Sequence, residues 1–270
     1  MAIFCFGYRL LCATRLYLIR LITNTLTTRC ARWGQKHVGS LASLVIVPYV
    51  FYARYAGVRA LREMSMEELK NKNTEYLSSI GLEVPEHLPK IESLDEVNPR
   101  TAQDIAGRLS ALAYVIGLGF DAKGKDLLES LTKYNLMPYV SGYERELLNQ
   151  DIIGSQDKIN MSWLPECAQA LAWCIGLVEL DHFRHCDDDL AHKIPFKTDP
   201  QKFIQKAELR PIAEIQEQSD LLYRMHWYVR NCSLTGKECE LSEGIVSERR
   251  KAIDWVYGVE EDWDDVPMDT

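Results

Sequence analysis

Charged side chains occur in the second half of the sequence at positions where helical periodicity predicts a buried face. Glu166, His226 and Arg249 each recur at helical spacing with apolar residues. Burial of a charge is costly unless the charge is paired. A carboxylate, an imidazole and a guanidinium that line one pocket could transfer protons or bind an anion. The alternative is a buried network of ion pairs that fixes helix packing. Residue spacing does not separate the two hypotheses, and we favour the second.

Further polar residues near these three extend the candidate set. Asp220 and Arg224 are four residues apart, which is also the spacing of an ordinary surface ion pair on a helix. Aspartates at a frayed chain end would contact no other residue. We therefore expect the tail to pack against the domain and to bring an aspartate to Arg249 or Arg224. We assign no catalytic role to this candidate polar cluster, which consists of Glu166, Arg210, Asp220, Arg224, His226, Glu248, Arg249, Asp264 and Asp269.

The segment GFDAKGKD, from Gly119 to Asp126, has the glycine and lysine spacing of a phosphate-binding P-loop. A P-loop follows a buried strand and ends in Gly-Lys-Ser/Thr, whose hydroxyl group holds magnesium. Here the preceding residues have the pattern of a helix, and Asp126 takes the hydroxyl position, where its carboxylate would repel a triphosphate. We therefore expect a helix end and a helix–helix turn, and no nucleotide site.

The segment DHFRHCDDDLAH contains three histidines and a cysteine within eleven residues, and these side chains are zinc ligands in other proteins. Their spacing fits no recognised zinc finger. The three consecutive aspartates lack the alternation and the glycine of a calcium loop. We expect a solvated acidic loop, and we predict no metal and no other cofactor. The candidate ligands were His182, His185, Cys186 and His192.

The cysteine pattern indicates a reducing compartment, because none of the eight cysteines forms a Cys-x-x-Cys pair. Cys167 and Cys174 lie on an apolar segment and are expected to be small core residues. Cys232 and Cys239 would pair only in an oxidising setting. The expected location is cytoplasmic.

From Ser65 onward the apolar residues recur with a period close to 3.6, which predicts helices almost throughout. Patterns typical of helix starts begin at Ser65, Thr101 and Ser141. No run alternates apolar and polar residues long enough to require a sheet. The predicted fold is mainly α, a single multi-helix globular domain over 65–270. The expected helices cover roughly 65–80, 101–116 and 122–134, a segment from 141, 162–180, a segment from 199, 211–231 and 244–257.

Two further expectations concern the core. We place Pro165 in the first turn of a central helix that is apolar nearly all round. Five tryptophans are interpreted as core anchors rather than as a cage that stacks on a ligand. They are Trp163, Trp173, Trp227, Trp255 and Trp263.

Residues 1–62 form a basic, apolar N-terminal extension that differs from the rest of the chain. They contain nine basic residues and no acidic one, which leaves 22 basic and 39 acidic residues in 63–270. An acidic body repels nucleic acid, so we predict no nucleic-acid partner. The apolar stretch of about 15 residues over 38–52 is shorter than the roughly 20 that span a bilayer. Three hypotheses remain for 1–62: a membrane anchor, a targeting segment or a mis-assigned start.

Four separated motifs in the C-terminal half occur in a characteristic order: SWLPECAQALAWCIGLVEL, AELRPIAEIQEQSDLLYRMHWYVRN, GIVSERRKAIDWVYG and WDDVPMDT. Together they resemble the family called domain of unknown function 4272, over about residues 66–270. The resemblance implies a mostly helical, intracellular domain without an established activity. Arg250 and Asp254 depart from the family pattern, so we expect neither to carry essential chemistry.

These observations favour an uncharacterised intracellular domain that binds a protein or a small ligand without catalysis. One alternative is a hydrolase- or transferase-like enzyme that uses Glu166, His226, Arg249 and a tail aspartate. Such an enzyme requires the four side chains to converge on one open cleft. A second alternative is a membrane-tethered adaptor, in which membrane association arises only through residues 1–62.

Overall fold

The computed structural model describes residues 64–270, so the three hypotheses for residues 1–62 lie outside the described part. The predicted mainly α fold is confirmed: the described residues form α-helices and short 3-10 helices, without a strand. Residues Met64–Thr270 make one compact unit. Within this range no helix is long and apolar enough to cross a bilayer.

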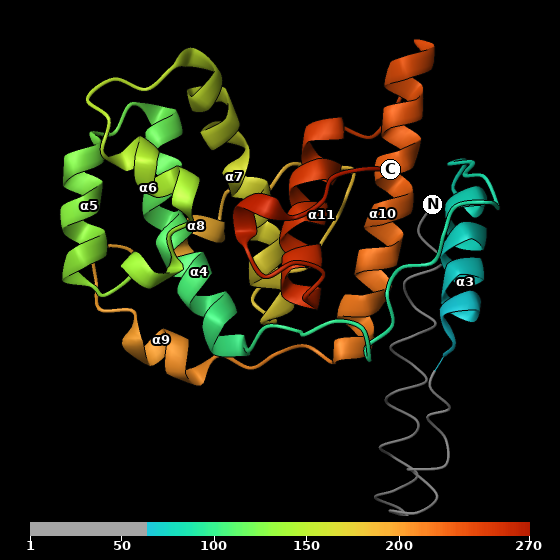
Figure 1. The fold of residues 1–270 in the computed structure, drawn as a ribbon, viewed down its shortest axis with the longest axis horizontal. Coiled ribbons are helices and arrows are strands. Elements are labelled where there is room, and N and C mark those ends of the chain that lie inside the picture. The colour runs from blue at the N-terminus through green and yellow to red at the C-terminus, as the bar shows by residue number, and fades with distance from the viewer. Residues whose placement is uncertain (1–63) are drawn as a thin grey trace, which may run out of the picture. The chain divides into compact units, whose positions relative to one another are not determined.

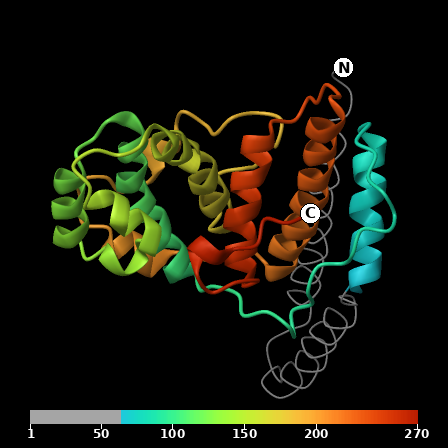
Figure 2. The ribbon, with the colours of Figure 1, turned by 45° about the horizontal axis from the view of Figure 1, so that its top comes forward.

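The longer helices lie side by side in a row. From one end of the domain to the other, the order is α3, α10, α11, α7 and α4 (Figures 1 and 2). The helices are α3 (Met66–Ser79), α4 (Ala102–Val115), α5 (Gly124–Lys133), α6 (Gly142–Leu148), α7 (Ser155–Cys174), α8 (Leu190–Lys193), α9 (Gln201–Lys206), α10 (Ile212–Thr235) and α11 (Glu243–Tyr257); the 3-10 helices are η1 (Ile116–Phe120), η2 (Met137–Tyr139) and η3 (Trp263–Asp265).

Capping boxes start three of these helices, as the sequence patterns predict. The side chains of Ser65, Thr101 and Ser141 each accept a hydrogen bond from the backbone N–H three residues later. The acidic side chain at that later position accepts in turn from the backbone of the capping residue. Each cap satisfies N–H groups that would lack partners at a helix start, which stabilises the helix by about 1 kcal/mol.

The position of Pro165 differs from the prediction. Pro165 lies inside α7, because the helix begins ten residues earlier, at Ser155. The polar stretch before the proline hides the helical period, and Gly154 stands at the N-cap without a side-chain hydrogen bond. Since proline has no N–H, the carbonyl of Met161 loses its usual helical partner. The prediction for α10 was also short, since this helix continues to Thr235 and ends at Gly236 in the left-handed conformation.

The apolar residues of α3 are only partly buried. Leu69 and Leu77 are buried, but Tyr76 and Ile80 are exposed. Asn73 takes the remaining buried position and donates to the carboxylate of Asp220 on α10 at 2.8 Å. A polar contact between helices therefore replaces an apolar one.

The core runs through α4, α7, α10 and α11, whose facing leucines and isoleucines are buried. Cys167 and Cys174 are buried in it as free thiols, as predicted. Trp173, Trp255 and Trp263 are buried, whereas Trp163 and Trp227 are half-buried. The P-loop-like segment forms η1, a turn and the start of α5, which confirms the predicted helix–helix turn.

The end of α11 fixes the segment that leads into α4. Gly258 has a φ of +89°, and a Cβ atom there would lie 2.2 Å from the carbonyl oxygen of Asn98. The backbone N–H of Arg100 donates to the carbonyl of Val256 at 2.9 Å. Two features therefore require glycine at position 258: the positive φ, and the close contact with the backbone of Asn98.

We predict that Gly258→Ala destabilises the domain much more than Gly236→Ala. Both positions have positive φ, and in each case alanine adds a conformational cost of about 1–2 kcal/mol. Only Gly258 faces backbone atoms, so overpacking adds a further cost of about 1–3 kcal/mol there. Urea unfolding of the two variants measures the difference. Equal losses would contradict the tight contact with Asn98.

Candidate functional site

The nine residues of the candidate polar cluster do not meet in one site. Glu166 pairs with Arg249, and Asp220 pairs with Arg224. His226 belongs to a separate network, where it hydrogen-bonds to a residue outside the candidate set. The enzyme mechanism that requires Glu166, His226 and Arg249 around one cleft therefore lacks a common location for its groups.

The Glu166–Arg249 pair joins α7 to α11 and also holds the loop after α7. The Nε and Nη2 atoms of Arg249 donate to Oε2 of Glu166 at 3.0 and 2.8 Å. Two further N–H groups of Arg249 donate to the carbonyls of Asp181 and Arg184 at 2.7 and 2.9 Å. The other oxygen of Glu166 accepts from the backbone N–H of Cys186 at 2.9 Å. The two charged side chains therefore bond to each other and to backbone groups of the loop after α7.

Glu248 lies next to Arg249 in the sequence but faces a different group. The Cys167 thiol donates to the carboxylate of Glu248 at 3.0 Å and to its carbonyl at 3.2 Å. Burial raises the pKa of Glu248, and burial raises that of the Cys167 thiol strongly. A thiol held protonated in this way is a packing residue and not a nucleophile.

The Asp220–Arg224 pair is buried and is not the surface ion pair that its spacing suggests. The side chains of Arg224 and Asp220 are 0% and 1% exposed. Arg224 donates to both carboxylate oxygens at 2.9 and 2.6 Å and to the carbonyl of Pro89 at 3.3 Å. Asn73 supplies a further donor to Asp220. Because α3 and the segment after it cover the pair, water does not reach it.

His226 lies beside Arg250, which the sequence analysis left outside the candidate set together with Asp254. Arg250 donates to His226 Nδ1 at 2.7 Å, to Asp254 at 3.1 Å and to the carbonyl of Asp269 at 2.8 Å. Ser219 donates to the second oxygen of Asp254 at 2.6 Å. The i,i+4 spacing of Arg250 and Asp254 on an apolar helix was the available signal. Both residues depart from the family pattern and nevertheless take part in this buried network.

Arg210 holds the end of α7 in place. It donates to the carbonyls of Trp173 and Val178 at 2.6 and 3.2 Å and to Glu179 at 2.8 Å. Its guanidinium also lies 4.9 Å from the centre of the Trp173 ring system.

The histidine-rich loop follows, and no group of His, Cys, Asp or Glu in residues 64–270 has an arrangement suited to a metal ion.

The tail packs back onto the domain, but through partners other than Arg249 and Arg224. The carboxylate of Asp264 accepts from the backbone N–H of Tyr143 at 2.8 Å. Asp269 uses its carbonyl, which accepts from Arg250. Trp263, which directly precedes Asp264, is buried, and its ring lies edge-on to Trp255 at a centroid distance of 5.4 Å.

A further buried pair escaped the sequence analysis. Arg108 on α4 donates to both oxygens of Glu144 on α6 at 2.6 Å each, and to the carbonyl of Tyr139 at 2.8 Å. Its guanidinium lies 4.1 Å from the centre of the Trp263 ring system. Glu144 also completes the capping box of α6 that starts at Ser141, and this local role was the only one that the sequence pattern indicated.

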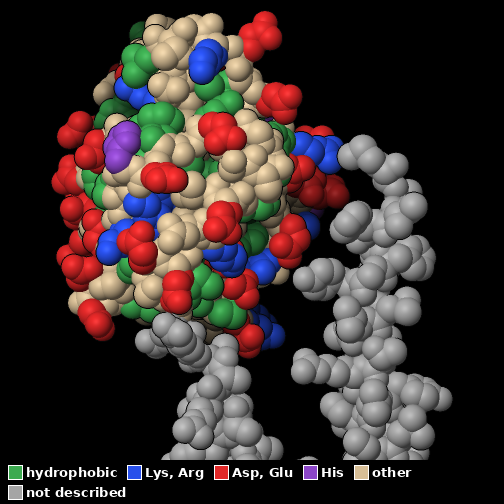
Figure 3. Space-filling model, turned by 90° about the vertical axis from the view of Figure 1, so that its right-hand side faces the viewer, with side chains coloured by type: hydrophobic (Ala, Val, Ile, Leu, Met, Phe, Trp, Pro, Cys, Tyr) green, Lys and Arg blue, Asp and Glu red, His purple; other side chains and the backbone are tan. Residues whose placement is uncertain are grey.

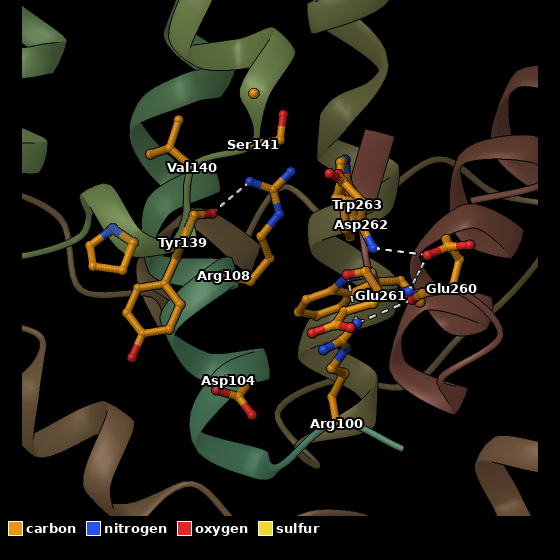
Figure 4. Close-up of a pocket in the computed structure, with 13 residues that line it drawn as sticks. Arg100, Asp104, Arg108, Tyr139, Val140, Ser141, Glu260, Glu261, Asp262 and Trp263 are labelled. Carbon is orange, nitrogen blue, oxygen red and sulfur yellow. Dashed lines mark hydrogen bonds between the residues drawn. The ribbon is translucent and has the colours of Figure 1, made fainter. Parts of the chain in front are cut away.

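Arg108 forms part of the wall of a large cavity, which we call the C-terminal cleft. Its volume is about 860 Å³, and it lies between the start of α4, the segment before α6 and the chain after α11 (Figure 4). Arg100 crosses one side and donates to the carbonyls of Glu260 and Glu261 at 3.1 and 2.6 Å. The cleft is lined by Arg100, Asp104, Arg108, Pro138, Tyr139, Val140, Ser141, Gly142, Trp255, Glu260, Glu261, Asp262 and Trp263.

The C-terminal cleft is acidic although it contains two arginines. Four carboxylates line it against two guanidinium groups. Arg108 is neutralised by Glu144, and Arg100 is held over Trp255 at 4.9 Å. Glu261 and Asp262 are exposed. The two arginines therefore hold the walls together. In the described part of the chain no arginine pairs with the four lining carboxylates, although Asp104, Glu260 and Asp262 accept hydrogen bonds from backbone N–H groups.

The family model described as Domain of unknown function (DUF4272) matches residues 69–266, so the chain belongs to this family. The match confirms the resemblance drawn from the four C-terminal motifs. No curated protein and no solved structure matches the chain. The family description states no activity.

We predict opposite pH effects for the two titratable partners of Arg250. Burial raises the pKa of Asp254 to about 6, so its contribution to stability is lost as the pH rises from about 4 to 6. Burial and then the charge of Arg250 lower the pKa of His226 to about 4, so its contribution is lost as the pH falls from about 6.5 to 4.

Relative to the unsubstituted protein, His226→Gln should therefore lose stability as the pH rises from about 4 to 6, and Asp254→Asn should gain it. Each change should amount to about 1–3 kcal/mol across this range. Urea unfolding at several pH values measures both slopes. Slopes of the same sign in the two variants would rule out this assignment.

Proposed function

We propose that the domain binds a basic segment of a partner protein in the C-terminal cleft, without catalysis. The observation that carries the proposal is the acidic lining of this cleft, whose two cations are engaged within the protein. A ligand with positive charge would meet carboxylates that no arginine neutralises. A ligand with negative charge would meet the same carboxylates and be repelled.

The cleft is large enough for a short peptide segment, and its rim offers polar groups to one. Its volume lies near the upper end of the range of about 300–1,000 Å³ for small-molecule sites. Trp255 and Trp263 line the cleft, but both rings are buried and lie beneath Arg100 and Arg108. Ser141 and the exposed acidic residues Glu261 and Asp262 offer polar groups for a peptide backbone.

The charge of the whole domain supports a basic partner. Residues 63–270 contain 39 acidic and 22 basic residues, and acidic side chains are spread over the face of the domain in Figure 3. Such a field steers a cationic partner toward the surface and raises the association rate. We therefore propose a protein partner rather than a nucleic acid, and we propose a cytoplasmic location for the complex.

We predict that basic peptides bind the full chain and that Glu261→Lys weakens them by about tenfold. The Glu261 side chain is exposed at the cleft, so its charge reversal leaves the core unchanged. Binders would be selected from a displayed library of random peptides and measured by tryptophan fluorescence, because Trp255 and Trp263 line the cleft.

Glu75→Lys on α3 is the matched control, because Glu75 is exposed and does not line the cleft. This variant should change the affinity by less than about twofold, and higher salt should weaken binding to the unsubstituted protein. Selection of peptides without Lys or Arg, or equal affinity in Glu261→Lys, would refute the proposal.

A further inference from the structure

A second cavity lies where α4, α7 and α8 meet, and we call it the α8 pocket. Its volume is about 350 Å³, within the range of small-molecule sites. It shares no lining residue with the C-terminal cleft. The walls are apolar and include Ile116, Pro165, Leu190, Ile194 and Phe196. The pocket is therefore a separate candidate site that the proposed function does not use.

The outer wall of the α8 pocket is an aromatic side chain held in place by a second one. Phe196 is 47% exposed, and its ring lies 5.0 Å from that of Tyr114. The hydroxyl of Tyr114 accepts from the backbone N–H of Lys197 at 2.8 Å. This arrangement leaves apolar surface open to solvent beside Leu190 and Ile194, and such surface favours an apolar ligand.

The charged residues that line the α8 pocket are both acidic. Asp187 and Asp188 lie at its edge, and both are exposed. Burial raises the pKa of the neighbouring Cys186 thiol, which therefore stays neutral. The ammonium of Lys197 lies 5.3 Å from the centre of the Phe196 ring, but Lys197 is not among the lining residues. The pocket thus combines an apolar interior with a negative edge.

Buried polar groups hold these aspartates in position. The backbone N–H of Cys186 donates to Glu166 at 2.9 Å, and the N–H of Asp187 donates to Gln169 at 3.3 Å. Glu166 is itself held by Arg249. A segment fixed in this way presents its carboxylates to a ligand with little further loss of conformational entropy.

We infer that the α8 pocket binds a small organic cation, a primary amine with an aromatic or branched aliphatic body. The apolar body fills the space between Ile116, Leu190 and Ile194. The ammonium group lies at the edge and pairs with Asp187 or Asp188. This inference is independent of peptide binding in the C-terminal cleft.

The first test compares three probes of similar shape by NMR titration of the full chain: 2-phenylethylamine, 2-phenylethanol and 3-phenylpropanoate. The amine should bind about two- to fivefold more tightly than the alcohol, because it adds one exposed ion pair. The acid should bind more weakly than the alcohol. Equal affinities, or no binding of the amine at millimolar concentration, would overturn the inference.

The second test assigns the binding to the pocket. The double variant Asp187→Asn, Asp188→Asn should reduce the affinity for the amine to that for the alcohol. Asp189→Asn is the matched control, because Asp189 is adjacent and exposed but does not line the pocket, and it should leave the preference for the amine intact. Ala113→Phe should fill the pocket and abolish binding of both probes. Retention of the preference in the double variant, or its loss in the Asp189 variant, would contradict the assignment.

Discussion

A buried guanidinium group has five N–H donors, and one carboxylate accepts only part of them. This mismatch organises the domain. Each of four nearly inaccessible arginines pairs with a carboxylate and also donates to a carbonyl in a segment outside the α-helices. The arginines are Arg108, Arg224, Arg249 and Arg250, and the carbonyls belong to Tyr139, Pro89, Asp181, Arg184 and Asp269. The helices are thus packed by apolar contacts, and the segments between them are held by arginines.

This arrangement also forms both cavities. Arg108 positions the segment before α6, which forms one wall of the C-terminal cleft, while Arg100 holds the opposite wall at Glu260 and Glu261. Arg249 and Glu166 hold the loop whose aspartates border the α8 pocket. Since a buried donor that loses its partner costs about 1–3 kcal/mol, each of these hydrogen bonds favours the observed position of its segment. Rigid loops over a helical core provide a preorganised surface for binding.

The local signals in the sequence predicted the fold class and several helix starts, but they did not predict the residues that form the site. Helical period and capping patterns predicted the mainly α class and the starts at Ser65, Thr101 and Ser141. Periodicity also indicated that Glu166 and Arg249 are buried. It did not indicate which partner each charge takes, because Arg108 and Glu144 are 36 residues apart and meet only through tertiary packing. Both cavities lie between segments that are distant in sequence, so spacing alone did not predict them.

The most direct test of this account is amide hydrogen exchange, measured by mass spectrometry, on Arg108→Lys and Arg249→Lys. Lysine keeps the charge but lacks the planar set of donors. Each variant should accelerate exchange by about tenfold in the segment that its own arginine holds, 137–144 for Arg108 and 181–186 for Arg249, and leave the other segment unchanged. The same exchange pattern in both variants would show that these arginines support only global stability and would contradict the account.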